Sequence, residues 1–276
     1  MNQKKIILGK IGYLNVLPIY FPLEQQIIKN SFEIIEGIPA HLNELASQGK
    51  LDISGTSSIE YARNHEKYLL VPDICIGSNG AVMSVLFLSK LPVDKLNGKK
   101  IGLTSHSHTS VALLKMYLAE KNIDAKFVTG NVMTMSNNRK IAGILAIGDE
   151  ALYLRKQSVF PYVLDLGEEW RKWTGLPFVF GVWVVNKKSS KDKKEIIKAC
   201  KLLIQAKEWG KKRLDMFASI IEKKNILSYE DGLSYFNGLI YDMREKHLQG
   251  LNLFYHFLYN YKLIPKIPKI EFIGTW

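Results

Sequence analysis

A turn rich in hydroxyl groups lies near the middle of the chain. Residues 99–103 form a short apolar run that predicts a buried strand before it. Apolar residues at 111, 113, 114, 117 and 118 predict one face of a helix after it. Since a helix leaves its first N–H groups unpaired, hydroxyls there favour a carboxylate or phosphate site. One hydroxyl suffices to cap a helix, as Ser107 or Thr109 could, but this turn has five: Thr104, Ser105, Ser107, Thr109 and Ser110.

Two other strand-to-helix turns have a similar composition. Residues 54–58 are small and mostly hydroxylic, and they follow a predicted strand over 51–54. Gly148 and Asp149 follow a predicted strand over 141–147. Ligands of open α/β sheets bind beyond the carboxyl ends of the strands. The three turns therefore point toward one cleft.

Strands and helices are expected to alternate along most of the chain, which predicts an α/β fold with a largely parallel sheet. We expect two lobes: residues 1–90 plus 187–276, and residues 91–186. The chain would cross between them near 90–97 and again near 180–188. Residues 131–139 read as a loop. From 191 to about 261 the pattern is helical, with breaks expected near 225–228 and at Gly250.

Composition excludes several classes of protein. The 276 residues are 47% hydrophobic and 23% charged, as in ordinary soluble proteins, and no apolar run is long enough to span a membrane. The net charge of +12 is spread along the chain, so we expect solvated surfaces and no nucleic-acid partner. Cys75 and Cys200 lack metal-ligand spacing and are expected to be buried thiols. The basic start of the chain resembles a first strand more than a signal peptide, so we expect a cytoplasmic enzyme or binding protein.

Six motifs in order resemble one enzyme family. The chain resembles chorismate dehydratase of the futalosine route to menaquinone over about residues 11–185. It departs from the family pattern at Ser57, Ala142 and Gly181. The motifs are Tyr13-Leu14-Asn15-Val16-Leu17-Pro18, Ser58-Ile59-Glu60-Tyr61 with Leu70-Val71-Pro72-Asp73, Ser84-Val85-Leu86, Thr104-Ser105 with Thr109-Ser110-Val111-Ala112-Leu113-Leu114, Ile147-Gly148-Asp149-Glu150-Ala151-Leu152, and Thr174-Gly175-Leu176-Pro177-Phe178-Val179-Phe180.

The resemblance implies a two-lobed, periplasmic-binding-protein-like type II fold with a ligand cleft between the lobes, used as a cytoplasmic enzyme. It implies dehydration of chorismate, a dianion, to 3-[(1-carboxyvinyl)oxy]benzoate, with no metal or organic cofactor and no nucleic-acid or membrane partner. We expect a monomer or homodimer. The implied catalytic residues are Asn15, Ser84 and Asp149. The expected substrate-binding residues are Gly55, Thr56, Ser57, Ser58, Thr104, Ser105, His106, Thr109, Ser110, Gly148 and Phe180.

The proton acceptor stays open. The amide of Asn15 cannot act as a base near neutral pH, so its expected role is orientation and charge stabilisation; without the resemblance it reads as a turn residue. Asp149 could be the base or a helix cap. His106 and His108 have suitable pKa values but also fit an exposed turn. A third hypothesis is that a carboxylate of the substrate takes the proton.

Two other functions remain. One is the sister lyase of the same pathway, which forms 1,4-dihydroxy-6-naphthoate. The other is a non-catalytic binding protein for a small carboxylate. Phe180 could pack on a substrate ring, whereas Trp183 is expected to pack in the core.

Overall fold

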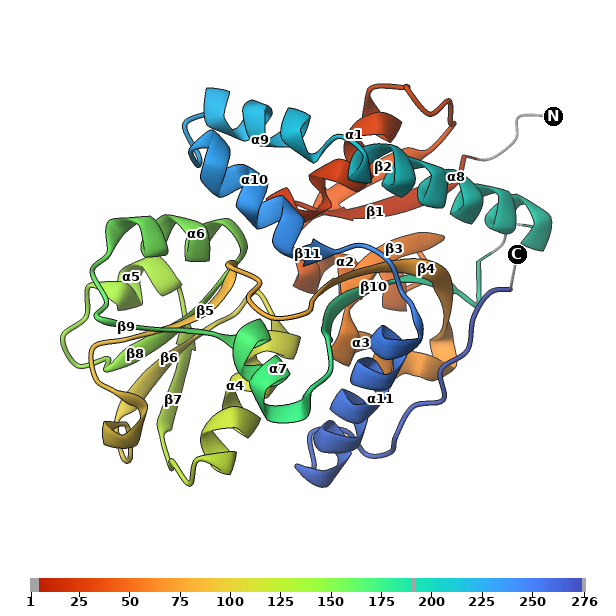
Figure 1. Cartoon of the computed structure of the whole chain (residues 1–276). Coiled ribbons are helices and arrows are strands. Elements are labelled where there is room, and N and C mark those ends of the chain that lie inside the picture. The colour runs from red at the N-terminus through yellow and green to blue at the C-terminus, as the bar shows by residue number, and fades with distance from the viewer. Residues whose placement is uncertain (1–4, 190–191, 275–276) are drawn as a thin grey trace.

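The strands form two separate sheets (Figure 1). The computed structural model describes residues 5–189 and 192–274. Over these residues the first sheet has the order β11 (Leu239–Ile240), β4 (Tyr68–Ser78), β10 (Phe178–Asn186), β3 (Ile53–Ser57), β1 (Ile7–Ile11) and β2 (Glu33–Gly37). The second has the order β7 (Lys126–Gly130), β6 (Lys100–Thr104), β8 (Gly143–Ile147), β5 (Val85–Ser89) and β9 (Tyr162–Asp165).

Both sheets are mixed, so the expectation of a largely parallel sheet is wrong. β1 pairs in parallel with β2 and β3, and β6 pairs in parallel with β7 and β8. β5 and β10 are antiparallel to both of their neighbours. Each of these two strands reaches its sheet from the other sheet. Neither therefore follows the crossover helix that links parallel neighbours.

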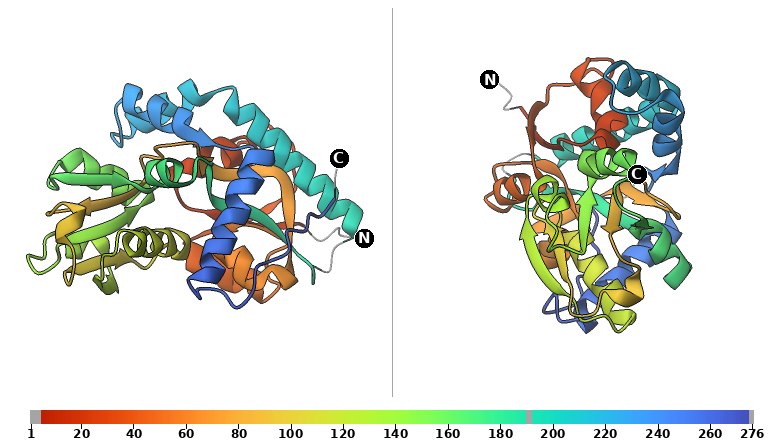
Figure 2. Two further views of the ribbon diagram at one scale, coloured as in Figure 1. Left: turned by 60° about the horizontal axis from the view of Figure 1, so that its bottom comes forward. Right: turned by 90° about the vertical axis from the view of Figure 1, so that its left-hand side faces the viewer.

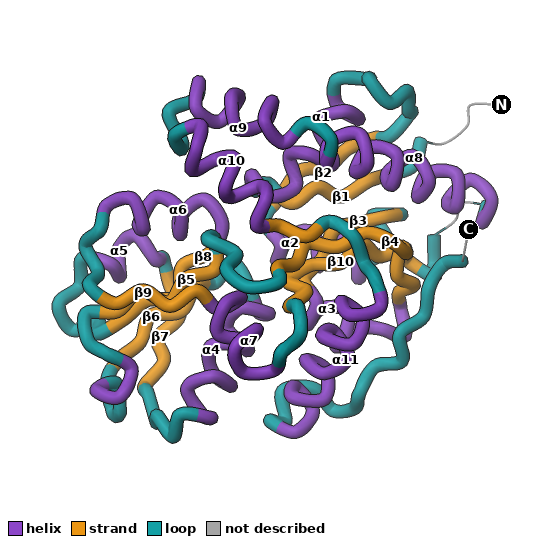
Figure 3. Tube along the Cα trace, in the orientation of Figure 1, coloured by secondary structure: helices purple, strands orange, loops and turns teal. Residues whose placement is uncertain are grey.

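The crossings also lie earlier in the chain than the lobe boundaries predicted at 90 and 187. β5 belongs to the second sheet, although the sequence placed residues up to 90 in the first lobe. β10 belongs to the first sheet, although the sequence placed it in the second. The chain crosses over residues 79–84 and returns through α7 (Leu166–Thr174) and the residues after it, which Figure 3 shows between the two groups of strands. Both strands are continuous apolar runs, and such runs do not indicate which sheet they join.

Most of the remaining helices of the first two thirds of the chain follow strand ends. In α1 the proline Pro18 occupies the first turn, where its missing N–H costs no hydrogen bond. The predicted loop over 131–139 contains a helix, because the side chain of Asn131 accepts a hydrogen bond from Thr134 N and caps it. These helices are η1 (Leu14–Val16), α1 (Leu17–Glu24), α2 (Pro39–Ser47), α3 (Ser58–Asn64), η2 (His65–Lys67), η3 (Val93–Lys95), α4 (His108–Glu120), α5 (Val132–Ser136) and α6 (Gly148–Gln157).

The C-terminal helices pack mainly on the first sheet and on the helices beside it (Figure 2). They are α8 (Lys193–Lys211), α9 (Leu214–Lys223), α10 (Tyr229–Gly238) and α11 (Glu245–Asn260). The break at 225–228 is confirmed, since the side chain of Ser228 caps α10. The predicted break at Gly250 is wrong. Gly250 lies inside α11, where a Cβ would overlap the carbonyl oxygen of Pro177, so the glycine permits close packing and does not end the helix.

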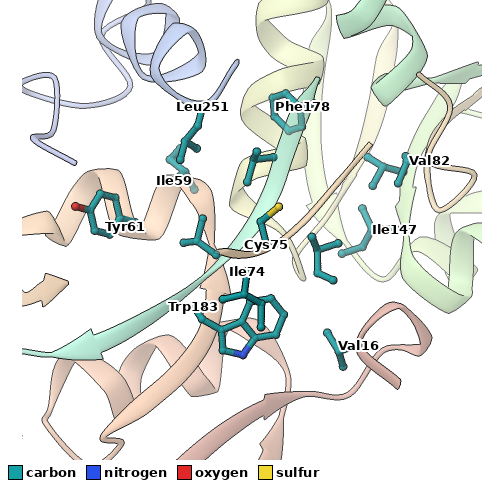
Figure 4. Packing of buried hydrophobic residues seen from close by; sticks show 14 of the residues in the cluster. Val16, Ile59, Tyr61, Ile74, Cys75, Val82, Ile147, Phe178, Trp183 and Leu251 are labelled. Atoms are coloured by element: carbon teal, nitrogen blue, oxygen red, sulfur yellow. The ribbon is translucent and has the colours of Figure 1, made fainter. Parts of the chain in front are cut away.

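One hydrophobic core extends across the boundary between the sheets. Val82 and Ile147 lie opposite Trp183 and Val16 in Figure 4, and all four are buried. Cys75 and Cys200 are buried and free, as predicted. Among the described helices, none is long and apolar enough to cross a membrane.

Candidate active site between the two sheets

A cavity between the two sheets collects residues from all three predicted turns. The space in it that no protein atom fills is about 690 Å³, including the part that is open to solvent. Its lining comes from the strand ends, the crossing segment and the first turns of three helices. The lining residues are Ile11, Tyr13, Asn15, Val16, Pro39, Gly55, Thr56, Ser57, Ile76, Val82, Ser84, Val85, His106, Ser107, Ser110, Ile147, Gly148, Phe180, Gly181, Val182 and Trp183.

The hydroxyl-rich turn divides between lining the cavity and supporting the fold. Ser107 and Ser110 line the cavity, and Ser107 also caps α4 by accepting a hydrogen bond from Ser110 N over 3.1 Å. Thr104 does not line it, and its Oγ1 accepts a hydrogen bond from His106 N. Thr109 is buried, and its Oγ1 accepts one from Ile59 N. Capping and cavity lining therefore coexist in this turn, and Thr104, Ser105 and Thr109 are not among the lining residues.

The turn after β3 is divided in the same way. Gly55, Thr56 and Ser57 line the cavity, and Oγ of Ser57 is buried with no hydrogen-bond partner among the described residues. Ser58 points elsewhere, since its Oγ donates to the carbonyl oxygen of Val179 over 2.6 Å. Only the strand side of this turn therefore faces a ligand.

Asn15 and Tyr13 bring polar atoms without partners to the first lobe's side of the cavity. Asn15 lies in η1, and its Oδ1 is buried with no hydrogen-bond partner among the described residues. The hydroxyl of Tyr13 is also buried with no hydrogen-bond partner among the described residues. Burial raises the pKa of Tyr13, and the carboxylates of Glu150 and Asp149 raise it further, so the phenol stays protonated and able to donate.

Gly148 and Asp149 of the second lobe contact the residues around Asn15, namely Tyr13 and Leu14. Gly148 has a φ of +56°, and a Cβ on it would stand 2.9 Å from the ring of Tyr13. Asp149 does not line the cavity; its Oδ1 accepts a hydrogen bond from Leu14 N over 3.3 Å. Burial raises the pKa of Asp149, the Leu14 N–H lowers it, and the charge of Glu150 raises it. Asp149 thus supports the turn that carries Asn15.

Aromatic side chains form another wall. Phe180 lines the cavity, with its ring centroid 4.5 Å from that of Phe178. Trp183 lines it too, although it is buried in the core as predicted and donates from Nε1 to the hydroxyl of Tyr20. Such a wall suits a flat, unsaturated ring.

The electrostatics of the cavity favour an anion without any lysine or arginine. None of the described residues that line it is Lys or Arg. α6 begins at the lining residue Gly148, and α3 and α4 begin directly after the lining residues Ser57 and Ser107, so the positive ends of three helix dipoles lie beside the cavity. His108 lies outside, with Nδ1 3.5 Å from Arg63, and burial and that guanidinium lower its pKa. Within the described part of the chain, no group of three or more His, Cys, Asp and Glu side chains could hold a metal ion.

Comparison with known proteins assigns the family. The family model for menaquinone biosynthesis matches residues 6–260. The chain belongs to the menaquinone biosynthesis family. This menaquinone biosynthesis protein is 30% identical over 204 residues to chorismate dehydratase of Thermus thermophilus, covering 68% of this chain and 72% of that one. It is 32% identical over 179 residues to chorismate dehydratase of Campylobacter jejuni, covering 63% of this chain and 65% of that one.

A solved structure confirms the fold of this chain. The periplasmic aliphatic sulphonate binding protein of Escherichia coli superimposes with a TM-score of 0.70 at 12% identity, covering 98% of this chain and 96% of that one. The expected periplasmic-binding-protein-like fold, with two lobes built on separate sheets, is therefore present.

Sequence reasoning missed residues that support the site in space but lie far from it along the chain. Asp165 accepts hydrogen bonds from the backbone N–H groups of Val82 and Met83 and so fixes the crossing segment just before Ser84. Tyr235 of α10 donates to Oγ of Ser84 over 3.4 Å. The two residues of the Met83–Asp165 contact are 82 positions apart in the sequence, and those of the Ser84–Tyr235 contact are 151 positions apart. No local sequence pattern predicts either contact. Asp165 alone carried a local signal, as an acidic residue at the start of a predicted helix.

Proposed function

We propose that this menaquinone biosynthesis protein is a chorismate dehydratase, a lyase that removes water from chorismate to give 3-[(1-carboxyvinyl)oxy]benzoate. The proposal is supported by the two relatives of that name. The structural observation that carries it is the meeting of three helix N-termini at one cavity that also contains Asn15 and Ser84. Such a cavity suits a small dianion with a ring.

The reaction takes a proton from one ring carbon and expels the hydroxyl of a neighbouring ring carbon. The electrons of the broken C–H bond form the new ring double bond, and the proton and hydroxide leave as water. Because the ring becomes aromatic, the step is downhill. The protein has to hold one conformer, stabilise the departing hydroxide and leave room for the proton acceptor.

Asn15 and Ser84 are proposed to act on the reacting atoms. The amide of Asn15 can donate to the departing oxygen while Oδ1 accepts from the substrate, which gives the buried Oδ1 a partner. Ser84 is buried and its hydroxyl, supported by Tyr235, lies in the cavity wall. Asp149 is proposed to position Asn15 through Leu14.

The proton acceptor is proposed to be a carboxylate of the substrate. No Asp, Glu or Lys is among the described residues that line the cavity. The hypothesis predicts that Asp149→Asn, His106→Ala and His108→Ala each keep near-normal turnover at saturating chorismate. A collapse of turnover in any one of them, with product binding intact, would assign that residue as the base instead.

The deciding experiment incubates chelator-treated protein with chorismate and follows the mass and absorbance of the product. A product lighter by one water, with an aromatic spectrum, supports the dehydratase and its independence from metal. Binding without turnover would point to a carboxylate-binding protein. If chorismate is neither bound nor changed, the sister lyase's cyclic substrate is the next to test. We propose that the activity is cytoplasmic.

A further inference from the structure

His106 is the one described side chain lining the cavity that can carry a positive charge. It lies between β6 and α4, held by a hydrogen bond from its own backbone N–H to Oγ1 of Thr104. Its Nδ1 stands 3.9 Å from Oε2 of Glu150, which is slightly too long for a hydrogen bond.

Glu150 has an unusual setting for a carboxylate. It belongs to the first turn of α6, two residues after Gly148, and its Oε2 is buried with no hydrogen-bond partner among the described residues. Asp149 and the protonated hydroxyl of Tyr13 are the other titratable groups nearby. The imidazole of His106 is thus the positively chargeable group that faces this oxygen.

We propose that Glu150 and His106 act as a pair that binds one carboxylate of the substrate. Glu150 orients the ring by attracting Nδ1–H, and Nε2–H, on the opposite side of the ring, donates to the carboxylate. Both residues belong to the lobe of the second sheet, so the pair is formed before a ligand arrives. This assignment rests on the proposed function, since it supplies one of the contacts that a dianionic substrate requires.

The pair acts in binding and not as the base. A histidine that donates to a carboxylate through Nε2 has no free lone pair for the ring proton. The contact also adds an imidazole N–H donor to a cavity whose other described polar lining comes from hydroxyls, an amide and the starts of helices. Loss of a hydrogen bond to a charged group costs about 1.5–3 kcal/mol, which corresponds to an affinity loss of about tenfold to a hundredfold.

The test measures equilibrium binding of three probes to the full chain: the diacid 3-[(1-carboxyvinyl)oxy]benzoate and the monoacids 3-methoxybenzoate and 2-phenoxyacrylate, which each keep one of its carboxylates. We expect His106→Phe to weaken diacid binding at least about tenfold and to weaken only one of the two monoacids. Glu150→Gln should weaken the same two probes by less. The double variant should be no weaker than His106→Phe. The matched control is His108→Phe, two residues away and outside the cavity, which should bind all three as the parent does.

Two further measurements, steady-state kinetics and the ¹⁵N signals of the His106 ring, distinguish a role in positioning the substrate from a merely structural role. His106→Asn, a second and smaller change, should raise KM for chorismate with little change in kcat. The ¹⁵N signals of the His106 ring should shift when the diacid is added, and this shift should be altered in Glu150→Gln. Unchanged diacid affinity in both His106 variants overturns the pair while leaving the dehydratase intact. Parent protein that neither binds the diacid nor converts chorismate overturns the proposed function and the pair together.

Discussion

Oγ1 of Thr109 in α4 accepts a hydrogen bond from the backbone N–H of Ile59 in α3 over 3.0 Å. The contact crosses from the lobe of the second sheet to that of the first, 50 residues away in the chain. It satisfies one of the N–H groups that the start of α3 leaves without an intrahelical partner. A residue that the sequence assigned to the ligand thus holds the two lobes together beside the cavity.

Thr109→Val should therefore destabilise the fold. The valine keeps the shape of the side chain but leaves a buried N–H unpaired, which costs about 1–3 kcal/mol in the free energy of unfolding. Chemical denaturation of the full chain measures the loss. Thr109→Ser, which keeps the acceptor oxygen, is the control and should lose less. Equal stability of the two variants would mean that this hydrogen bond contributes nothing.

Gly148→Ala should impair both stability and activity. The alanine would adopt a φ of +56°, and its Cβ would press against the ring of Tyr13. Gly98→Ala is a matched control for the backbone conformation alone, because Gly98 has a φ of +69° with nothing within 4 Å of an added Cβ. We expect each variant to lose about 1–2 kcal/mol for the left-handed conformation, and Gly148→Ala to lose more.

Activity separates the two glycine variants further. Gly148→Ala should lower kcat/KM for chorismate at least about tenfold, because a displaced Tyr13 moves the turn that carries Asn15. Gly98→Ala should leave kcat/KM unchanged. If both variants keep full activity, the contact between Gly148 and Tyr13 has no part in shaping the site.

The site could be predicted from the sequence where its chemistry is local. The turns at 54–58, 104–110 and 148–149 were recognisable because hydroxyls and glycines follow apolar strands, and each contributes to the cavity. Which residues of these turns line the cavity and which support the fold could not be predicted. Whether Thr109 faces a ligand or contacts Ile59, for example, depends on how the two lobes meet. For the same reason the sheet membership of β5 and β10 and the contact from Tyr235 to Ser84 had no local signal. The wrong prediction at Gly250 shows that the presence of a glycine does not by itself predict the end of a helix. Glycine ends some helices, and in others it lets a neighbouring backbone approach.

Asn15→Ala should reduce the rate of the chemical step more than the affinity. Removing one preorganised donor beside developing negative charge typically costs a factor of about 10²–10³ in kcat. Binding of 3-[(1-carboxyvinyl)oxy]benzoate should change by less than about tenfold, since the contacts proposed for its carboxylates come from other residues. Asn15→Asp should lose both activity and affinity because it adds a negative charge facing a dianion. An Asn15→Ala variant with near-normal kcat would remove Asn15 from the mechanism.

Asp149→Asn should raise stability at neutral pH. Burial holds the pKa of Asp149 above its ordinary value of 3.8, so the folded state retains a proton that the unfolded chain has already released. The stability that the protonated carboxyl contributes is complete below the unfolded pKa and is lost as the pH rises through the folded pKa. Asparagine does not titrate, and its Oδ1 can still accept the hydrogen bond from Leu14 N.

The two proteins should therefore differ little in unfolding free energy near pH 4, and the Asn variant should become the more stable one by pH 7. Denaturation series across this range measure the difference. A variant that is less stable than the parent at pH 7 would show that the attraction between the ionised carboxylate and the Leu14 N–H outweighs the cost of burying the charge.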